Sequence, residues 1–509
     1  MADLYLVFVH GWSVDDLSTY GQMPLRLKAE CARQGINAIV QEIWLGQYVS
    51  FRDEIQLPDV SRAFQAAVER QLTGITGAGK RFICITHSTG APVIRDWWDR
   101  YYRTTGQPCP MSHLIMLAPA NFGSALAQLG KSKLSQLKFW LHGEQPGQGI
   151  LDWLELGSAE SWELNSSWIQ LPALPTGPTG FYPFVLIGQS IDRNFYDNLN
   201  RYTGELGSDG VVRSAAANLN ATLITIDQTL IRNNDGSISD EPSPPDIKFY
   251  TAPATAFRIV PDRSHSGSVM GILTSVTLDP AINPPNQVTV DAMLQCFQVT
   301  NDDQYAALRD SFAQATTGIQ AQERLETVES GPFALITRHF IHDRFCMVIF
   351  RVIDSEGYPV TNYKLVFTGP ENNPNYLPPG FFADRQQNQL NNETVTYFVN
   401  YDILTGSTPV TDPNGAVIRP ATTGITQLGL DVTPHLDAGF VRYLPLHLSA
   451  DENFFQTIVK PNATILIDIT LQRLVSDQVF LNRGPIDAMP ANGSFKDIKP
   501  GEGVVPVIT

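Results

Sequence analysis

The sequence predicts an α/β protein with a mostly parallel sheet, followed by an all-β region. Strand-like and helical patterns alternate over the first 120 residues, which is typical of a parallel sheet covered by helices. Beyond about residue 331 the helical patterns give way to short strand-like runs separated by turns. The 509 residues are 43% hydrophobic, which is enough to bury a large core and suits two domains.

The elements of the first part follow in order. Continuous apolar runs at residues 4–9, 37–44, 82–86 and 113–118 predict strands that are buried on both faces. The stretches between them, near residues 22–34, 60–72 and 91–102, have helical spacing. We therefore expect helices on both faces of the sheet.

A tryptophan-rich segment at about residues 122–180 interrupts this alternation. It contains Trp140, Trp153, Trp162 and Trp168 among leucines at helical spacing, with Gly and Pro at its turns. We interpret it as a helical cap inserted into the sheet. Aromatic side chains at helical spacing usually pack inward, and the remainder could line an apolar substrate cleft.

The later elements complete the expected domains. Strand patterns resume at four places and two helices follow; the ranges are 181–188, 221–226, 248–251, 256–261, 288–299 and 304–322. The all-β region has strand-like runs at 345–353, 364–368, 395–403, 424–430, 440–448 and 464–471, and an irregular tail after residue 478. The predicted domains are 1–330, which is catalytic, and 331–509, which is sandwich-like.

Charge and cysteine usage limit the partners and the compartment. The net charge of −16 gives no excess of cations for phosphates and excludes a nucleic-acid partner. The net charge of residues 275–509 is −11, so we expect anionic membranes to repel this part of the chain. A protein partner would suit it. We expect any peripheral membrane contact to go through the cap.

The cysteines and the apolar runs favour a reduced compartment. The five cysteines lack CxxC spacing, no run reaches the length of a membrane span, and the N-terminal apolar run follows Asp3 rather than basic residues. The expected location is cytoplasmic, or outside the cell through a secretion system that needs no signal peptide.

The run at residues 80–92 predicts a strand that turns abruptly into a helix, with Ser88 at the corner. Such an elbow exposes a serine Oγ at the edge of a sheet. Gly90 gives the turn a small neighbour, and Pro92 suits a first helical turn. Thr86 stands where the usual G-x-S-x-G pattern has its first glycine.

A nucleophilic serine needs a histidine base and an acid that orients the histidine. On sheets with this elbow the chain order is serine, acid, histidine. That order favours His265, in a polar loop just after a strand-like run. Asp209, in Gly-Ser-Asp-Gly, is the favoured acid, and Asp192 is its rival.

An oxyanion hole needs two donors directed at one point. The N–H of Thr89, which follows the serine, is the first candidate. The second is the N–H of Trp12, in the turn after the first strand. His10 and Gly11 shape that turn, and we expect His10 to brace it rather than to react.

These motifs together resemble the α/β-hydrolase-fold lipases. The resemblance rests on His10-Gly11-Trp12, the elbow at Ser88, the run at 117–124, the Asp209 loop and the late His265, and it covers about residues 1–275. It implies hydrolysis of carboxylic esters through an acyl-serine intermediate, under a cap that controls lipid access. The cap, the lack of a signal peptide and the extra β region are similar to bacterial phospholipases and secreted lipase effectors.

The leading hypothesis is therefore a serine hydrolase acting on acyl esters of lipids, a lipase or phospholipase. The alternatives are a short-chain carboxylesterase, an acyltransferase, or an inactive hydrolase-like protein for adhesion or delivery. No cofactor is indicated. Asp354 with Glu356, and Asp412 with Asn414, could offer oxygen ligands to Ca²⁺, but solvated turns are the better interpretation.

Overall fold

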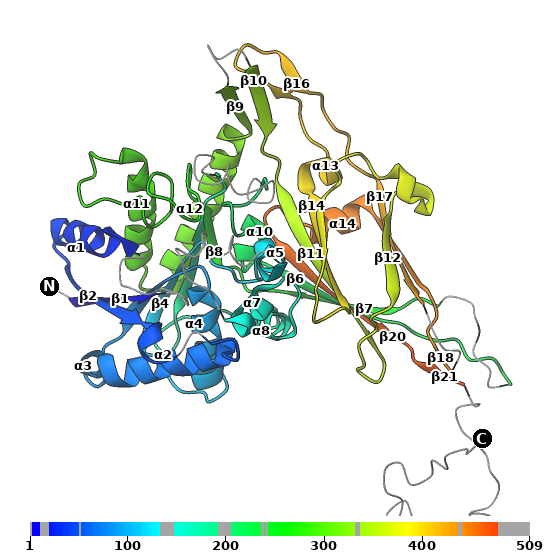
Figure 1. The fold of residues 1–509 in the computed structure, drawn as a ribbon, viewed down its shortest axis with the longest axis horizontal. Coiled ribbons are helices and arrows are strands. Elements are labelled where there is room, and N and C mark those ends of the chain that lie inside the picture. Colours follow the sequence, from blue (N-terminus) through cyan, green and yellow to red (C-terminus); the bar gives the residue numbers. More distant parts are fainter. Residues whose placement is uncertain are drawn as a thin grey trace, which may run out of the picture.

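The computed structural model describes residues 3–10, 20–49, 52–132, 147–191, 205–235, 239, 243–330, 336–435 and 440–476. Its first sheet has six parallel strands in the order β2-β1-β3-β4-β5-β8 (Figure 1). These strands are β1 (Asp3–His10), β2 (Asn37–Trp44), β3 (Phe82–His87), β4 (Met111–Leu117), β5 (Tyr182–Ile187) and β8 (Ala256–Ile259). The predicted parallel sheet is confirmed.

Helices cover both faces of this sheet. One face packs against α1 (Met23–Arg33), α11 (Gln287–Phe297) and α12 (Asp302–Gln322), and the other against α2 (Leu57–Gln71) and α4 (Gly90–Trp98). Strand β1 explains the continuous apolar runs, because Leu6 and Phe8 enter the first of these cores while Val7 and Val9 enter the second. A short π-helical turn, Asp99–Arg103, extends α4.

The described part of the cap contains α5 (Ala125–Ser132), α7 (Gln148–Leu154) and α8 (Ala159–Ile169). Trp153, Trp162 and Trp168 are 2%, 4% and 3% exposed, so the cap turns these rings inward. Trp140 lies outside the described residues. The expectation that most of the cap aromatics pack inward therefore holds for these three.

The all-β region, called the accessory region below, is built on two further sheets. One has the order β13-β14-β11-β20-β6-β7 and mixes parallel with antiparallel pairs, and the other has the order β12-β17-β19. The first contains β13 (Phe382–Gln387), β14 (Thr394–Asn400), β11 (Phe345–Asp354), β20 (Thr464–Leu471), β6 (Thr222–Asp227) and β7 (Asp246–Thr251). The second contains β12 (Tyr363–Thr368), β17 (Gln427–Pro434) and β19 (Leu446–Asp451), and the two share one core, as a sandwich does.

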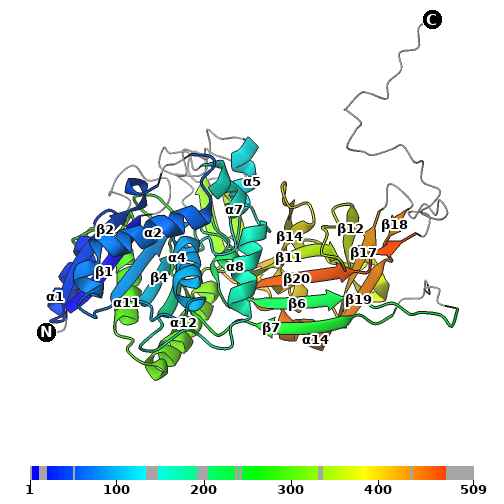
Figure 2. The same cartoon turned by 90° about the horizontal axis from the view of Figure 1, so that it is seen from below.

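Strands β6 and β7 belong to the accessory region, where β6 lies beside β20 and β7 lies on the other side of β6 (Figure 2). Both were predicted as strands of the part before residue 330. In the structure they belong to a sheet of the accessory region. The chain therefore enters the accessory region and returns between β5 and β8 of the first sheet.

Strand β11 joins the two halves of the molecule. Val348 and Phe350 enter the accessory core, whereas Met347 and Ile349 pack in the core that also holds α2 and α4. Because side chains alternate along a strand, one strand contributes to both cores.

Smaller elements complete the described fold. They are α3 (Thr73–Thr76), α10 (Ser214–Ala217), α13 (Tyr401–Thr405), α14 (Glu452–Ile458), β9 (Leu325–Ser330), β10 (Ile336–Ile341), β15 (Val410–Thr411), β16 (Val417–Arg419), β18 (Val441–Arg442) and β21 (Leu474–Val475), with short 3-10 turns at Leu45–Gln47, Pro284–Asn286, Pro370–Asn372 and Pro374–Tyr376.

Candidate active site

Ser88 lies at a sharp turn between β3 and α4. Its φ of 52° is in the left-handed region, which a non-glycine residue adopts only when its surroundings impose it. The neighbouring strand imposes it here, because the Ser88 N–H donates to the Leu117 carbonyl (3.0 Å) and the Ser88 carbonyl accepts from Ala120 N–H (3.3 Å). The elbow therefore fixes the serine by its backbone.

Thr86 and Gly90 pack together beneath the elbow. Thr86 is fully buried, and a Cβ added at Gly90 would lie 3.4 Å from the Thr86 Cβ. That distance is an ordinary van der Waals contact. The threonine at the usual glycine position is therefore accommodated without displacing α4.

The structure brings Ser88, His265 and Asp209 into one hydrogen-bonded series. His265 Nε2 lies 3.1 Å from Ser88 Oγ, and His265 Nδ1 lies 2.9 Å from Asp209 Oδ2. Asp209 is fully buried and His265 is 5% exposed. An imidazole held in this way can take the serine proton on Nε2 while the carboxylate orients Nδ1–H.

Asp209 is oriented by its own loop. Its Oδ1 accepts from the N–H groups of Val211 (3.0 Å) and Val212 (2.7 Å), which leaves Oδ2 for the histidine. The backbone N–H of His265 also donates to the Asp209 carbonyl at 2.9 Å. These backbone hydrogen bonds thus fix the position of Asp209 relative to His265. Asp192, the rival acid, lies outside the described residues.

Part of the predicted oxyanion hole can be placed. Thr89 is the N-cap residue of α4, 6% exposed, and its N–H makes no hydrogen bond within the described part of the chain. His10 ends β1, at the sheet edge that carries the elbow, while Gly11 and Trp12 lie outside the described residues. The place of Thr89, directly after Ser88 at the start of α4, agrees with its predicted role, which stays a prediction.

His87 packs next to the site. Its ring centroid lies 4.7 Å from that of His265, at 44° between the planes. This contact limits how far the His265 ring can turn, in keeping with the packing role that the sequence suggests for His87.

An ion pair that was not predicted from the sequence holds the acid loop. The side chain of Arg213 is 2% exposed; it donates to both Glu205 oxygens (2.9 and 2.7 Å) and to Asp384 in β13. Its guanidinium also lies 4.2 Å from the centre of the Phe398 ring. The accessory region therefore holds the loop that carries Asp209. A single arginine inside the apolar run at 211–217 was the only available signal.

The loop after β4 is bonded to the same acid loop. Ser124 Oγ donates to the Val211 carbonyl at 2.6 Å, and Asn121 Nδ2 donates to the Ala217 carbonyl at 2.7 Å. The motif that follows β4 thus serves to connect the nucleophile strands with the acid loop.

The two turns considered for Ca²⁺ use their carboxylates internally. Asp354, 1% exposed, accepts from Glu356 N–H and Tyr358 N–H and pairs with Arg473 (3.0 Å). Asp412 accepts from the N–H groups two and four residues further on. Within the described residues no cluster of three or more His, Cys, Asp or Glu side chains could hold a metal ion.

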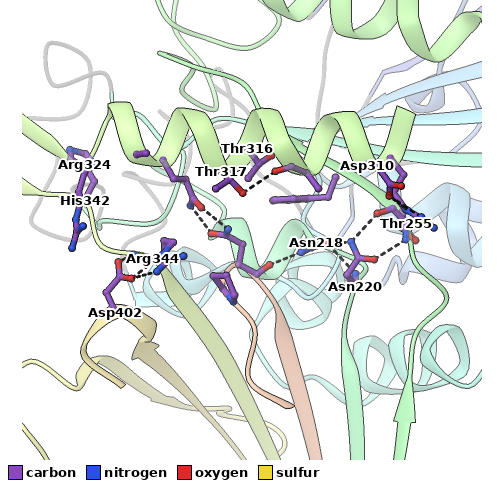
Figure 3. Close-up of a pocket in the computed structure, with 17 residues that line it drawn as sticks. Asn218, Asn220, Thr255, Asp310, Thr316, Thr317, Arg324, His342, Arg344 and Asp402 are labelled. Carbon is purple, nitrogen blue, oxygen red and sulfur yellow. Dashed lines mark hydrogen bonds and ion pairs between the residues drawn. The ribbon is translucent and has the colours of Figure 1, made fainter. Parts of the chain in front are cut away.

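A polar cavity of about 440 Å³ lies between α12 and the accessory region (Figure 3). Its lining groups bond to one another: Arg344 to Asp402 (2.9 Å), and Asn220 to the Thr255 carbonyl (2.9 Å). None of the three residues of the hydrogen-bonded series lines it. We therefore assign it no part in ester chemistry.

The full chain is similar to a known enzyme. Phospholipase PlaB from Legionella pneumophila is 39% identical, with a TM-score of 0.80, over 96% of this chain and 98% of that one. A second structure of that phospholipase, in complex with thio-NAD, is 37% identical, with a TM-score of 0.79, over 97% and 98%. The chain belongs to the PlaB phospholipase family. No protein-family model and no curated protein sequence matches it.

Membership in the PlaB family covers the accessory region as well as the α/β-hydrolase part, since both chains align over almost their whole length. The fold predicted from the resemblance to α/β-hydrolase lipases is confirmed, and so is its lipid ester hydrolase class. Among the described residues, no helix has both the length and the apolar character needed to cross a bilayer.

Proposed function

We propose that this protein hydrolyses acyl esters of phospholipids, with Ser88 as nucleophile, His265 as general base and acid, and Asp209 as the orienting acid. The observation that carries the proposal is the pair of contacts from the His265 ring, 3.1 Å to Ser88 Oγ and 2.9 Å to Asp209 Oδ2. The near full-length similarity to a phospholipase supports the lipid substrate.

The chemistry follows from this geometry. Ser88 Oγ attacks the ester carbonyl carbon while His265 Nε2 takes the serine proton, and the carbonyl oxygen becomes an oxyanion beside the Thr89 N–H. Collapse breaks the ester C–O bond, and His265 returns the proton to the departing alcohol oxygen. Water then attacks the acyl-serine by the same steps, which releases the fatty acid and restores Ser88.

Asp209 acts by stabilising the imidazolium that forms in each step. Its carboxylate is removed from water and has hydrogen-bond donors on both oxygens, so it stays fixed while the charge on His265 appears and disappears.

The decisive test is Ser88→Ala on dispersed phospholipid. We expect turnover to fall at least about 10⁴-fold, because the acyl-enzyme can no longer form. Exposed Ser268→Ala is the matched control and should retain wild-type turnover. Mass analysis should show fatty acid and lysolipid as products of the wild type. Wild-type turnover by Ser88→Ala would refute the mechanism.

The same preparation tests the alternative functions. A fluorophosphonate probe should label the wild type and not Ser88→Ala; no labelling of the folded wild type would favour the inactive adhesion or delivery protein. Preference for butyryl over long-chain esters, without a rise in rate above the aggregation threshold, would favour a short-chain esterase. Acyl transfer to an added alcohol in place of hydrolysis would favour an acyltransferase.

A further inference from the structure

Four exposed apolar side chains gather at one edge of the hydrolase part. Leu25, Val269, Leu278 and Ile282 are 59%, 66%, 46% and 70% exposed. We call these four residues the apolar edge. Large apolar side chains with this much exposure, grouped on one surface, usually mark a contact with another body.

The apolar edge lies at the end of the sheet that carries the nucleophile. Helix α1 follows the carboxyl end of β1, so its first turn, with Leu25, lies at that end. The far end of α11 reaches the opposite edge, where His113 at the start of β4 hydrogen-bonds to the Val299 carbonyl (2.8 Å). The loop that enters α11 therefore lies at the carboxyl end too, with Ser88.

Hydrogen bonds hold that loop against α1. Buried Arg26 donates from Nη1 to the Thr277 carbonyl at 2.9 Å, and the Leu278 N–H donates to Gln22 Oε1 at 2.7 Å. Leu25 and Leu278 are thereby brought to the same surface by buried Arg26 and exposed Gln22.

Hydrogen bonds also connect the loop that precedes α11 to the segment that carries His265. Arg263, two residues before His265, donates to Ser275 Oγ at 3.1 Å and to the Asn286 side chain. Asn283 Nδ2 donates to the Val269 carbonyl at 3.2 Å, which places Ile282 near Val269. Hydrogen bonds therefore hold the apolar edge in a fixed position next to the loop that carries His265, and its four side chains make no contact with the triad in the described chain.

This surface carries few charges, and the α1 side contributes one exposed cation, Lys28, one turn after Leu25. From residue 266 to residue 286 the only charged side chain is Asp279, and its carboxylate accepts from the Ala281 N–H at 2.9 Å, within its own turn. Arg26 is 2% exposed and its charge is compensated by Glu30. An occupant of this surface is recognised by apolar contact.

The cap offers no comparable surface in its described part. Across residues 147–180 no large hydrophobic side chain is exposed. Contact between the cap and a membrane stays a prediction, but the exposed apolar groups nearest the base belong to the apolar edge.

We propose that the apolar edge docks the protein on aggregated phospholipid, with its four side chains entering the acyl-chain region and the elbow facing the lipid. This inference rests on the proposed function. The occupant is lipid because the surface is apolar, adjoins the base in sequence and structure, and belongs to a chain of the PlaB phospholipase family. A net charge of −16 leaves apolar insertion as the means of adsorption.

The first experiment removes the apolar side chains. A variant carrying Leu25→Ser, Val269→Ser, Leu278→Ser and Ile282→Ser should bind phosphatidylcholine vesicles at least about tenfold more weakly, since each change removes apolar area from the contact. Hydrolysis of vesicle lipid should fall equally, while turnover of a dissolved butyryl ester stays at the wild-type value. Wild-type binding should not weaken at high salt.

The matched control changes exposed apolar residues far from the triad. Val417→Ser with Phe454→Ser removes side chains that are 61% and 45% exposed, in β16 and α14 of the accessory region (Figure 1). This variant should bind vesicles as the wild type does. Equal loss in both variants would overturn the proposal, as would unchanged vesicle binding by the fourfold variant or a change only in its self-association.

A labelling experiment tests the same contact without loss of the surface. All five native cysteines are buried, so Ile282→Cys should react selectively with an environment-sensitive fluorophore. Its emission should shift to the blue on vesicles and be quenched by a quencher in the acyl region, whereas a label on Val417→Cys should do neither. Identical responses at the two positions would contradict docking through the apolar edge.

Failure of the docking proposal can be told from failure of the proposed function. If the wild type hydrolyses no phospholipid even in mixed detergent micelles, the proposed function is wrong. If it hydrolyses lipid in micelles and the fourfold variant matches it on vesicles, the function stands and the docking surface is wrong.

Discussion

The serine and the aspartate meet on the same histidine, yet different parts of the molecule hold them. Ser88 is fixed inside the first sheet by its bonds to Leu117 and Ala120 on the β4 side. The Asp209 loop is held to the accessory region by the ion pair between Arg213 and Asp384. Ser88, the proposed nucleophile, is therefore fixed by the hydrolase part alone, whereas Asp209, the proposed acid, depends on the accessory region as well.

The packing around two glycines also differs between the Ser88 elbow and the Asp209 loop. A Cβ at Gly90 would meet nothing in the described chain closer than 3.4 Å, whereas a Cβ at Gly207 would lie 2.6 Å from Cδ2 of Phe345 in β11. Gly207 also has φ +76°, which side chains rarely adopt. The Asp209 loop is thus more tightly packed than the Ser88 elbow, and the side chain that packs against it belongs to the accessory sheet.

The largest effect is expected at Gly207. Gly207→Ala adds a methyl group against Phe345 at a positive φ, so it should lower the free energy of unfolding by about 2–4 kcal/mol and reduce kcat for dissolved esters. Denaturant unfolding and steady-state kinetics measure both. Adding Phe345→Leu, which removes the nearest ring atoms, should recover part of the loss. If Gly207→Ala were as stable as the wild type, close packing between the Asp209 loop and the accessory sheet would be contradicted.

A smaller effect is expected from the ion pair. Asp384→Asn leaves buried Arg213 with Glu205 as its remaining carboxylate, which should cost about 1–3 kcal/mol of stability and lower kcat about tenfold. The control Asp343→Asn weakens the pair with Arg419, whose hydrogen bonds in the described chain go to Asp343 and Ser407, outside the acid loop.

The control should lose stability without losing kcat. KM for a dissolved ester should stay constant in both variants, because neither residue lines the elbow. Equal loss of kcat in the two variants would mean that Asp384 supports the fold in general and does not position Asp209. Recovery of kcat in Asp384→Glu would strengthen the positioning role.

The smallest effect is expected on the nucleophile side. Gly90→Ala should keep the free energy of unfolding within about 1 kcal/mol of the wild type, since alanine favours the helix and its methyl group meets only an ordinary contact. Turnover should change by no more than about threefold. A fall as large as that of Gly207→Ala would remove the difference between the two sides.

Local patterns predicted the candidate site residues that lie in short segments. The elbow at Ser88 and the Gly-flanked Asp209 each lie within a few residues of sequence, and chain order selects His265. The apolar runs of the first sheet were equally clear because both faces of those strands are buried. These elements are specified by neighbouring residues and need no knowledge of distant contacts.

The remaining features depend on contacts between distant residues. Asp384 and Arg213 are 171 positions apart, and nothing in either segment indicates the other. The strand character of β6 was visible, but its pairing with β20 depends on residues 464–471 and not on its own pattern. The exposure of Leu278 and Ile282 could not be predicted either, since exposure is a property of the folded surface.

The path of β6 has a consequence for how the protein is made on the ribosome. Between the acid and the base the chain runs out to a strand whose parallel partner, β20, is translated more than two hundred residues later. We expect the nascent chain to hold Ser88 in its elbow early, and to bring Asp209 and His265 together only when nearly all of the described chain has been synthesised. A lipid ester hydrolase built in this way would stay inactive until its translation is almost finished.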